Sequence, residues 1–130
     1  MSPKYNRVLI VDDNRINRLL VLRALKKSAF FKNFDFIEAE DGEDALALLN
    51  KYNNEFDLIL LDVDMPKMDG VEFLGKRFVD PRISQIPVIV ITTDDSRKKD
   101  VLALGIKDED FIVKPYTVNF LIEKVESMLS

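Results

Sequence analysis

Leu58-Ile59-Leu60-Leu61-Asp62 is the stretch that decides the fold, together with Val8-Leu9-Ile10-Val11-Asp12-Asp13 near the start of the chain. Each is a run of four apolar residues that ends in one or two aspartates. Continuous apolar runs of this length predict strands buried on both faces, unlike the alternating pattern of a sheet with one wet face. Such strands belong to parallel sheets covered by helices on both sides. The two stretches therefore predict the centre of a parallel sheet, with carboxylates where its strands end.

Outward from these strands, the chain alternates between strand and helix patterns. Further strands are predicted over residues 35–39, 87–91 and 111–113, and helices over about 15–28, from 42, over about 70–78 and 95–104, and after Lys114-Pro115. Three sets of apolar residues carry the helical periodicity: Ile16, Leu20 and Ala24; Ala45, Leu48, Leu49 and Tyr52; and Val118, Leu121, Ile122, Val125 and Leu129.

Five strand–helix units with right-handed crossovers predict an α/β fold, a doubly wound five-stranded parallel sheet. We expect the flavodoxin-like strand order 2-1-3-4-5. In that order, ligands bind beyond the carboxyl ends of the first and third strands. Asp12, Asp13 and Asp62 stand at those ends.

The composition limits what the chain can be. Its 130 residues, 47% apolar and 32% charged, predict one domain over residues 1–130 with a single hydrophobic core. Its longest apolar stretches run to about five residues, far short of the roughly 20 that cross a bilayer. The chain start lacks a signal-peptide pattern, so we expect a cytoplasmic protein without membrane contact. The net charge of −4 argues against direct nucleic-acid binding.

Two missing residue types narrow the chemistry. The chain has no cysteine and no histidine, which excludes disulfides, thiol catalysis and imidazole as base, metal ligand or phosphocarrier. Any metal site must therefore be built from oxygen. Oxygen ligands favour a hard divalent ion, Mg²⁺ first and Mn²⁺ as the second possibility.

The polar residues at the strand ends have structural interpretations when taken singly. Asp12 or Asp13 alone could cap a helix, Thr92 suits a strand, and Lys114 could be a solvated loop charge. Together they predict more, because two carboxylates ~5 Å apart repel by roughly 3 kcal/mol at an effective dielectric of ~20. Such a cluster predicts a bound cation. Carboxylates, a cation, a hydroxyl and an ammonium are what phosphoryl transfer requires, and the central Asp62 is the predicted acceptor.

These residues resemble those of a known family, the receiver domains of two-component response regulators. Residues 8–14 resemble the family's first strand and acidic pair, and residues 60–70, Leu-Leu-Asp-Val-Asp-Met-Pro-Lys-Met-Asp-Gly, resemble its phosphoacceptor segment. Thr92 and Lys114-Pro115 match the switch threonine and the lysine–proline pair, and Asp41-Gly42 matches a turn of the family. The likeness covers nearly the whole chain and implies the CheY-like form of the predicted fold.

The resemblance implies a phosphoprotein that carries 4-aspartylphosphate at Asp62. The phosphoryl group would come from a histidine kinase, a histidine phosphotransfer protein, or a small donor such as acetyl phosphate. Asp13 and Asp62 would bind Mg²⁺ directly together with the backbone carbonyl of Asp64, while Asp12 would contribute through water.

The resemblance also implies a switch. Thr92 would move toward the phosphoryl oxygens, Lys114 would pair with one of them, and Phe111 would turn inward on activation. The Lys114-Pro115 peptide would be cis. The readout surface would combine the helix near 95–104, the strand 111–113 and the last helix, and it would bind an unidentified protein target or form a weak homodimer of an otherwise monomeric chain. Such a chain is a signalling switch rather than an enzyme, since it catalyses only its own phosphorylation and dephosphorylation.

Four features depart from the family's common pattern. Asp64 and Asp94 add carboxylates near the site, which predicts tighter metal binding and an altered rate of phosphate loss. Thr93 is larger than the usual Ala or Gly and would narrow access to the acceptor. Residues 107–110, Lys-Asp-Glu-Asp, predict a longer loop before the last strand and a shorter fourth helix.

Two other functions stay open. Asp62-Val63-Asp64 is an Asp-x-Asp motif, as in haloacid-dehalogenase-type phosphatases, although there the motif opens the domain and the paired acids follow the lysine. A phosphorylation-independent interaction module on the same fold is the other. An FMN or dinucleotide carrier is disfavoured, because no Gly-rich phosphate loop follows any strand. The sequence leaves open whether the chain is free-standing or belongs to a hybrid kinase or a longer regulator.

Overall fold

The computed structural model describes residues 3–63, 65 and 68–130 of the chain. In chain order, its elements are β1 (Arg7–Val11), α1 (Arg15–Lys26), the 3₁₀ helix η1 (Ala29–Phe31), β2 (Asp35–Ala39), α2 (Gly42–Lys51), β3 (Leu58–Leu61), α3 (Gly70–Val79), β4 (Val88–Thr92), α4 (Lys98–Ala103), the 3₁₀ helix η2 (Asp108–Asp110), β5 (Phe111–Val113) and α5 (Val118–Leu129). Among these helices, none combines the length and the apolar composition needed to cross a bilayer.

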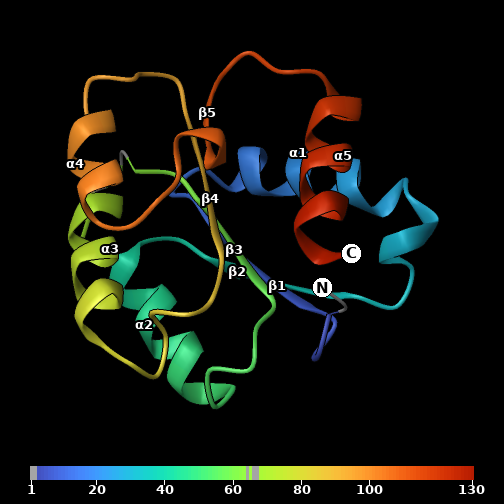
Figure 1. Cartoon of the computed structure of the whole chain (residues 1–130). Coiled ribbons are helices and arrows are strands. Elements are labelled where there is room, and N and C mark those ends of the chain that lie inside the picture. Colours follow the sequence, from blue (N-terminus) through green and yellow to red (C-terminus); the bar gives the residue numbers. More distant parts are fainter. Residues whose placement is uncertain (1–2, 64, 66–67) are drawn as a thin grey trace.

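The five strands form one parallel sheet in the order β2-β1-β3-β4-β5, which confirms the predicted topology (Figure 1). Leu9 of β1 lies between Ile37 of β2 and Ile59 of β3, and Leu61 of β3 pairs with Val90 of β4. The strands β1, β3 and β4 are buried almost throughout, as their continuous apolar sequences predict. Their carboxyl ends therefore meet at one edge of the sheet.

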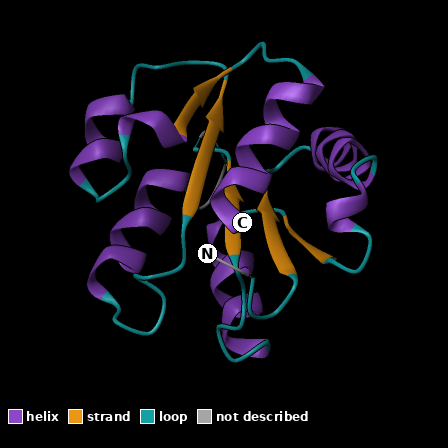
Figure 2. Ribbon diagram, turned by 45° about the vertical axis from the view of Figure 1, so that its right-hand side comes forward, coloured by secondary structure: helices purple, strands orange, loops and turns teal. Residues whose placement is uncertain are grey.

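The helices divide between the two faces of the sheet, as Figures 1 and 2 show. On one face, Leu9 and Val11 pack in a core with Ala45 and Leu49 of α2 and Phe73 of α3. On the other face, the alternate strand residues pack against α1 and α5, in a core that includes Val8, Ile10, Leu25, Leu121 and Val125. The result is a three-layer sandwich that leaves the carboxyl edge of the sheet uncovered by helices.

The i+4 row of apolar residues in the first helix lies mostly outside the core. Ile16 and Leu20 are 62% and 60% exposed, and only Ala24 of that set is buried. The i+4 row drifts about 40° around the helix at each step, because four residues exceed one turn. The row therefore leaves the buried side, which Leu25 and the half-buried Val21 occupy instead. In α5, Val118 is likewise 43% exposed although it begins the predicted apolar face.

The fourth helix begins at Lys98, three residues later than the predicted start at Asp95. The Asp94 carboxylate accepts hydrogen bonds from the backbone N–H of Ser96 at 2.8 Å and from its hydroxyl at 3.0 Å. An aspartate that binds the backbone two residues on favours a turn over a helix. Before β5, Asp108–Asp110 form the 3₁₀ helix η2, and α4 is six residues long.

Candidate metal centre

Three carboxylates meet at the carboxyl edge of the sheet. Asp12 and Asp13 follow β1, Asp62 follows the neighbouring β3, and one oxygen of each lies within 4.8 Å of the others. The sheet pairing fixes this approach, because the Asp62 N–H donates to the Val11 carbonyl at 2.9 Å and the Asp12 N–H donates to the Ala39 carbonyl at 3.1 Å. The sequence prediction that these three aspartates lie together is confirmed.

Asp12 is the buried member of the cluster, with 8% of its surface exposed. Its Oδ1 accepts a hydrogen bond from the backbone N–H of Asn14 at 2.8 Å. Burial raises the pKa of the Asp12 carboxyl, and the charge of Asp13 adds to that rise, while the Asn14 hydrogen bond and the charge of Lys114 oppose it. The ionised form of Asp12 is therefore poorly stabilised by the protein alone.

This arrangement fits a hard divalent cation. All the donors are carboxylate oxygens, which suit Mg²⁺ or Mn²⁺. A buried carboxylate whose anionic form is disfavoured, held close to two others, gains most when a cation neutralises the cluster. Asp64, predicted to add a backbone carbonyl, lies outside the described residues.

Thr92 and Lys114 end the two strands beside the cluster. Thr92 is 1% exposed, and its hydroxyl oxygen accepts a hydrogen bond from the Asp94 N–H at 3.3 Å. The Lys114 N–H donates to the Thr92 carbonyl at 2.7 Å, and the Lys114-Pro115 peptide is cis, as the resemblance implied. Lys114 lines a cavity of about 20 Å³ together with Asp12 and Asp62. The charge of Lys114 acts on Asp12, where it opposes the rise in the pKa of that carboxyl.

Phe111 lies at the start of β5 and is buried in the core on the α2, α3 and α4 side of the sheet. The Lys98 Nζ sits 5.6 Å from the centre of its ring and also pairs with Asp108 Oδ1 at 2.7 Å. The ring is thus held between the sheet and the first turn of α4.

Two glycines let helices pack against the segment that follows the acidic cluster. A Cβ on Gly70 would lie 2.3 Å from Val63 Cα and 2.7 Å from the Asp62 carbonyl oxygen. A Cβ on Gly42 would lie 2.7 Å from Met68 Cγ, and the Gly42 N–H donates to the Met68 carbonyl at 3.0 Å. The two glycines are therefore needed for the close approach of α2 and α3 to this segment.

The predicted Asp41-Gly42 turn is the start of α2, where the Asp41 carboxylate accepts from the Asp44 N–H at 2.8 Å.

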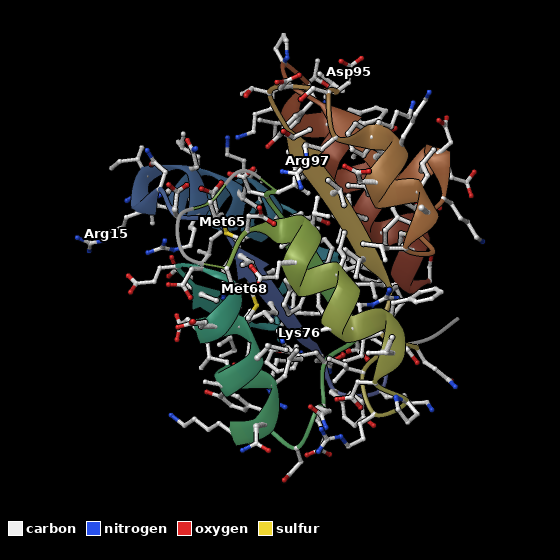
Figure 3. The ribbon with its side chains drawn as sticks, turned by 90° about the vertical axis from the view of Figure 1, so that its left-hand side faces the viewer. Arg15, Met65, Met68, Lys76, Asp95 and Arg97 are labelled. Atoms are coloured by element: carbon white, nitrogen blue, oxygen red, sulfur yellow. The ribbon has the colours of Figure 1, made fainter. Side chains whose placement is uncertain are left out.

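Sequence reasoning missed two arginines at the rim of the site. Arg18 of α1 donates from Nη1 to the Asp12 carbonyl at 2.6 Å and from Nε to Glu38 Oε1 at 3.0 Å. Arg97, just before α4, has its Nη1 3.7 Å from Asp69 Oδ2 at the start of α3, and Figure 3 labels it in a view onto the side of the molecule that carries α3. The position of Arg18, four residues after the helix cap Asn14, was the one usable signal for the first contact.

The comparisons with known proteins agree with this geometry. The sequence model of the response regulator receiver domain matches residues 8–126. The chemotaxis protein CheY homolog of Campylobacter jejuni is 32% identical over 123 residues, which cover 95% of this chain and 92% of that relative.

Solved structures match at similar identity. The phosphorylated cyanobacterial phytochrome response regulator RcpA has a TM-score of 0.78 at 29% identity, covering 96% of this chain and 91% of that one. The CheX–CheY–BeF₃–Mg²⁺ complex from Borrelia burgdorferi has a TM-score of 0.76 at 30% identity, covering 95% and 89% of the respective chains. With its 2-1-3-4-5 sheet and the acidic cluster at its carboxyl edge, the chain belongs to the response regulator receiver domains, of the CheY type.

Proposed function

We propose that Asp62 is the phosphoryl acceptor of a Mg²⁺-dependent signalling switch. The observation that carries this proposal is the meeting of Asp12, Asp13 and Asp62 within 4.8 Å beside Lys114. An Asp62 oxygen attacks the phosphorus of the donor and a P–O bond to Asp62 forms. The bond to the leaving group breaks, which is P–N for a phosphohistidine and P–O for acetyl phosphate. Acetyl phosphate releases acetate, and a phosphohistidine whose second ring nitrogen carries a proton releases the neutral imidazole of the donor.

Each neighbouring side chain has a role in this proposal. Asp12, Asp13 and Asp62 would hold Mg²⁺ or Mn²⁺, with the Asp64 carbonyl as a further ligand. The ion, when bound, supplies positive charge against the oxygens of the transferring group. The Lys114 ammonium pairs with one phosphoryl oxygen, and the Thr92 hydroxyl donates to another.

Two structural relatives support this chemistry. The RcpA structure is of the phosphorylated protein, and the Borrelia burgdorferi complex contains Mg²⁺ and BeF₃ with CheY and CheX. We extend the same capacity to this chain, with a histidine kinase or histidine phosphotransfer protein as donor. In this proposal, residues 1–130 form one receiver domain that acts in the cytoplasm. The domain catalyses only its own phosphorylation and dephosphorylation.

The output surface in this proposal is formed by α4, β5 and α5. Phe111 and Thr92 would couple it to the acceptor, because Phe111 lies against Lys98 of α4 and the end of β4 pairs with β5. Phe120 and Val113 on this surface are 49% and 42% exposed, which suits contact with a protein target or a second copy in a weak homodimer.

Intact-mass measurement after incubation with acetyl phosphate tests the acceptor. We expect one phosphoryl adduct with Mg²⁺ and none with EDTA. Asp62→Asn removes the adduct, whereas Asp35→Asn, a matched change at the exposed start of β2, retains it. An adduct on Asp62→Asn would assign the acceptor elsewhere.

The same experiment separates the alternatives. Continuous release of phosphate from added phosphate esters would favour a phosphatase that uses Asp62 and Asp64. If neither acetyl phosphate nor beryllofluoride with Mg²⁺ modified the wild-type protein, a phosphorylation-independent interaction module would replace the switch.

A further inference from the structure

Arg18 joins three elements at the edge of the acidic cluster. It lies in the first turns of α1, donates to the Asp12 carbonyl beyond β1 at 2.6 Å, and donates to Glu38 of β2 at 3.0 Å. Its side chain is 12% exposed although it carries a full charge. A guanidinium held by two acceptors in fixed directions is oriented far better than a lysine would be.

The carbonyl that Arg18 binds belongs to the peptide between Asp12 and Asp13. The other polar groups of Asp12 are also fixed, since its N–H donates to the Ala39 carbonyl and its Oδ1 accepts from the Asn14 N–H. The Arg18 bond adds the third constraint and sets the plane of the next peptide. The direction in which the Asp13 side chain leaves the backbone therefore depends on Arg18.

The charge of Arg18 opposes a nearby cation, but the ion pair with Glu38 offsets that effect. Glu38 pairs with Ile10 in the sheet register, so its carboxylate belongs to the strand beside β1. The Arg18–Glu38 pair is neutral as a whole. The Arg18 contact can therefore orient the Asp12–Asp13 peptide, but it cannot attract a cation.

We propose that Arg18 is a positioning residue of the cation site, which sets divalent-cation affinity by orienting the Asp12–Asp13 peptide. The inference rests on the proposed function, since it takes Asp12, Asp13 and Asp62 as the ligands. A residue of this kind acts through another residue and touches neither the ion nor the donor. Outer partners that orient metal ligands change affinity by about 10- to 100-fold when they are removed.

Titration of the whole chain with Mn²⁺, with free Mn²⁺ followed by electron paramagnetic resonance, tests the inference without any phosphorylation step. We expect Arg18→Met to weaken Mn²⁺ binding about tenfold or more. Arg18→Lys, which keeps the charge but not the two-directional donor, weakens it to a smaller extent. If Arg18 acted through its charge alone, Arg18→Met would instead tighten Mn²⁺ binding, because a positive charge would be removed from the edge of the site.

Arg77→Met is the matched control. Arg77 is another buried arginine whose Nε and Nη2 donate to a backbone carbonyl, that of Ile86, at 3.1 and 2.8 Å. Ile86 precedes β4, so this contact lies at the opposite edge of the sheet. We expect Arg77→Met to lower the thermal unfolding temperature in EDTA and to leave the Mn²⁺ affinity unchanged.

The outcomes separate the two proposals. If wild type binds Mn²⁺, Asp13→Asn abolishes binding and Arg18→Met leaves the affinity unchanged or raises it, the positioning role is overturned while the metal site stands. If wild type binds no Mn²⁺, both are overturned. If Arg18→Met does not fold, Arg18→Lys decides, because an affinity equal to wild type would exclude the proposed orientation.

Discussion

At the scale of single residues, Asp12 combines burial with the repulsion of like charges. Its pKa is raised above the ordinary 3.8 by burial first, with a further contribution from Asp13. The folded state therefore holds the Asp12 proton more tightly than the unfolded state does. The stabilisation that this proton gives is complete below pH 3.8 and is lost as the pH rises through the raised pKa.

Asp12→Asn is expected to raise the free energy of unfolding at pH 7 in EDTA. Burial of the charged Asp12 carboxylate is the largest cause of its raised pKa, and it outweighs the opposing contributions of the Asn14 hydrogen bond and Lys114. An uncharged amide avoids this cost, so we expect a gain on the order of 1 kcal/mol. Urea unfolding as a function of pH measures it, and the gain should shrink as the pH falls toward 3.8. A gain that persisted at pH 3 would contradict the explanation.

At the scale of secondary-structure elements, Gly70 lets the start of α3 pack closely against the backbone of Val63 and of Asp62, the proposed acceptor. Asp69 caps this helix by accepting from the Glu72 N–H at 2.9 Å, and Arg97 near α4 pairs with the same carboxylate group. The start of α3 thus connects the segment after β3 with the segment after β4. A displacement of the start of α3 would therefore move both of these segments.

Gly70→Ala is expected to destabilise the protein by about 1–3 kcal/mol, because the new methyl would overlap Val63 and the Asp62 carbonyl. We also expect slower modification by acetyl phosphate, since Asp62 moves with its backbone. Gly75→Ala is the control in the same helix. Nothing lies within 4 Å of its Cβ position, so it should stabilise by about 0.5–1 kcal/mol. Equal unfolding midpoints for the two variants would contradict the packing argument.

The elements could be predicted from the sequence where a pattern of apolar residues defines them, but not where a single side-chain contact does. The strand at 58–61 was predictable because its four apolar residues stand together, and the aspartate cluster followed from the strand order. The start of α4 was not predictable, because the Asp94 carboxylate accepts from the Ser96 N–H and forms a turn where the first helical turn was expected. Arg18 was not predicted as a site residue, because its contact with the Asp12 carbonyl depends on the orientation of its side chain. The second partner that holds this side chain, Glu38, is 20 residues away and is brought close by the β1–β2 register.

At the scale of the whole molecule, the proposed cation would link the acidic cluster to global stability. A ligand that binds only the folded state raises the free energy of unfolding by about 2.7 kcal/mol at a free concentration of 100 Kd. We expect Mg²⁺ to raise the urea midpoint of the wild-type protein in this way. Asp13→Asn should abolish the rise, whereas Arg77→Met should keep it on a lower baseline. An equal rise in Asp13→Asn would indicate binding at another place.

The two ends of the described chain lie together at the amino edge of the sheet. Pro3 and Lys4 line one cavity with Met128 and Leu129, and both ribbon views place the ends side by side (Figures 1 and 2). The molecule is therefore suited to circular permutation, with a short joining peptide here and new ends at the exposed Lys32 and Asn33. Permutation changes connectivity but no spatial neighbour, so the aspartate cluster would persist. A reporter placed in the joining peptide would sit at the amino edge of the sheet, opposite the edge that carries the aspartate cluster.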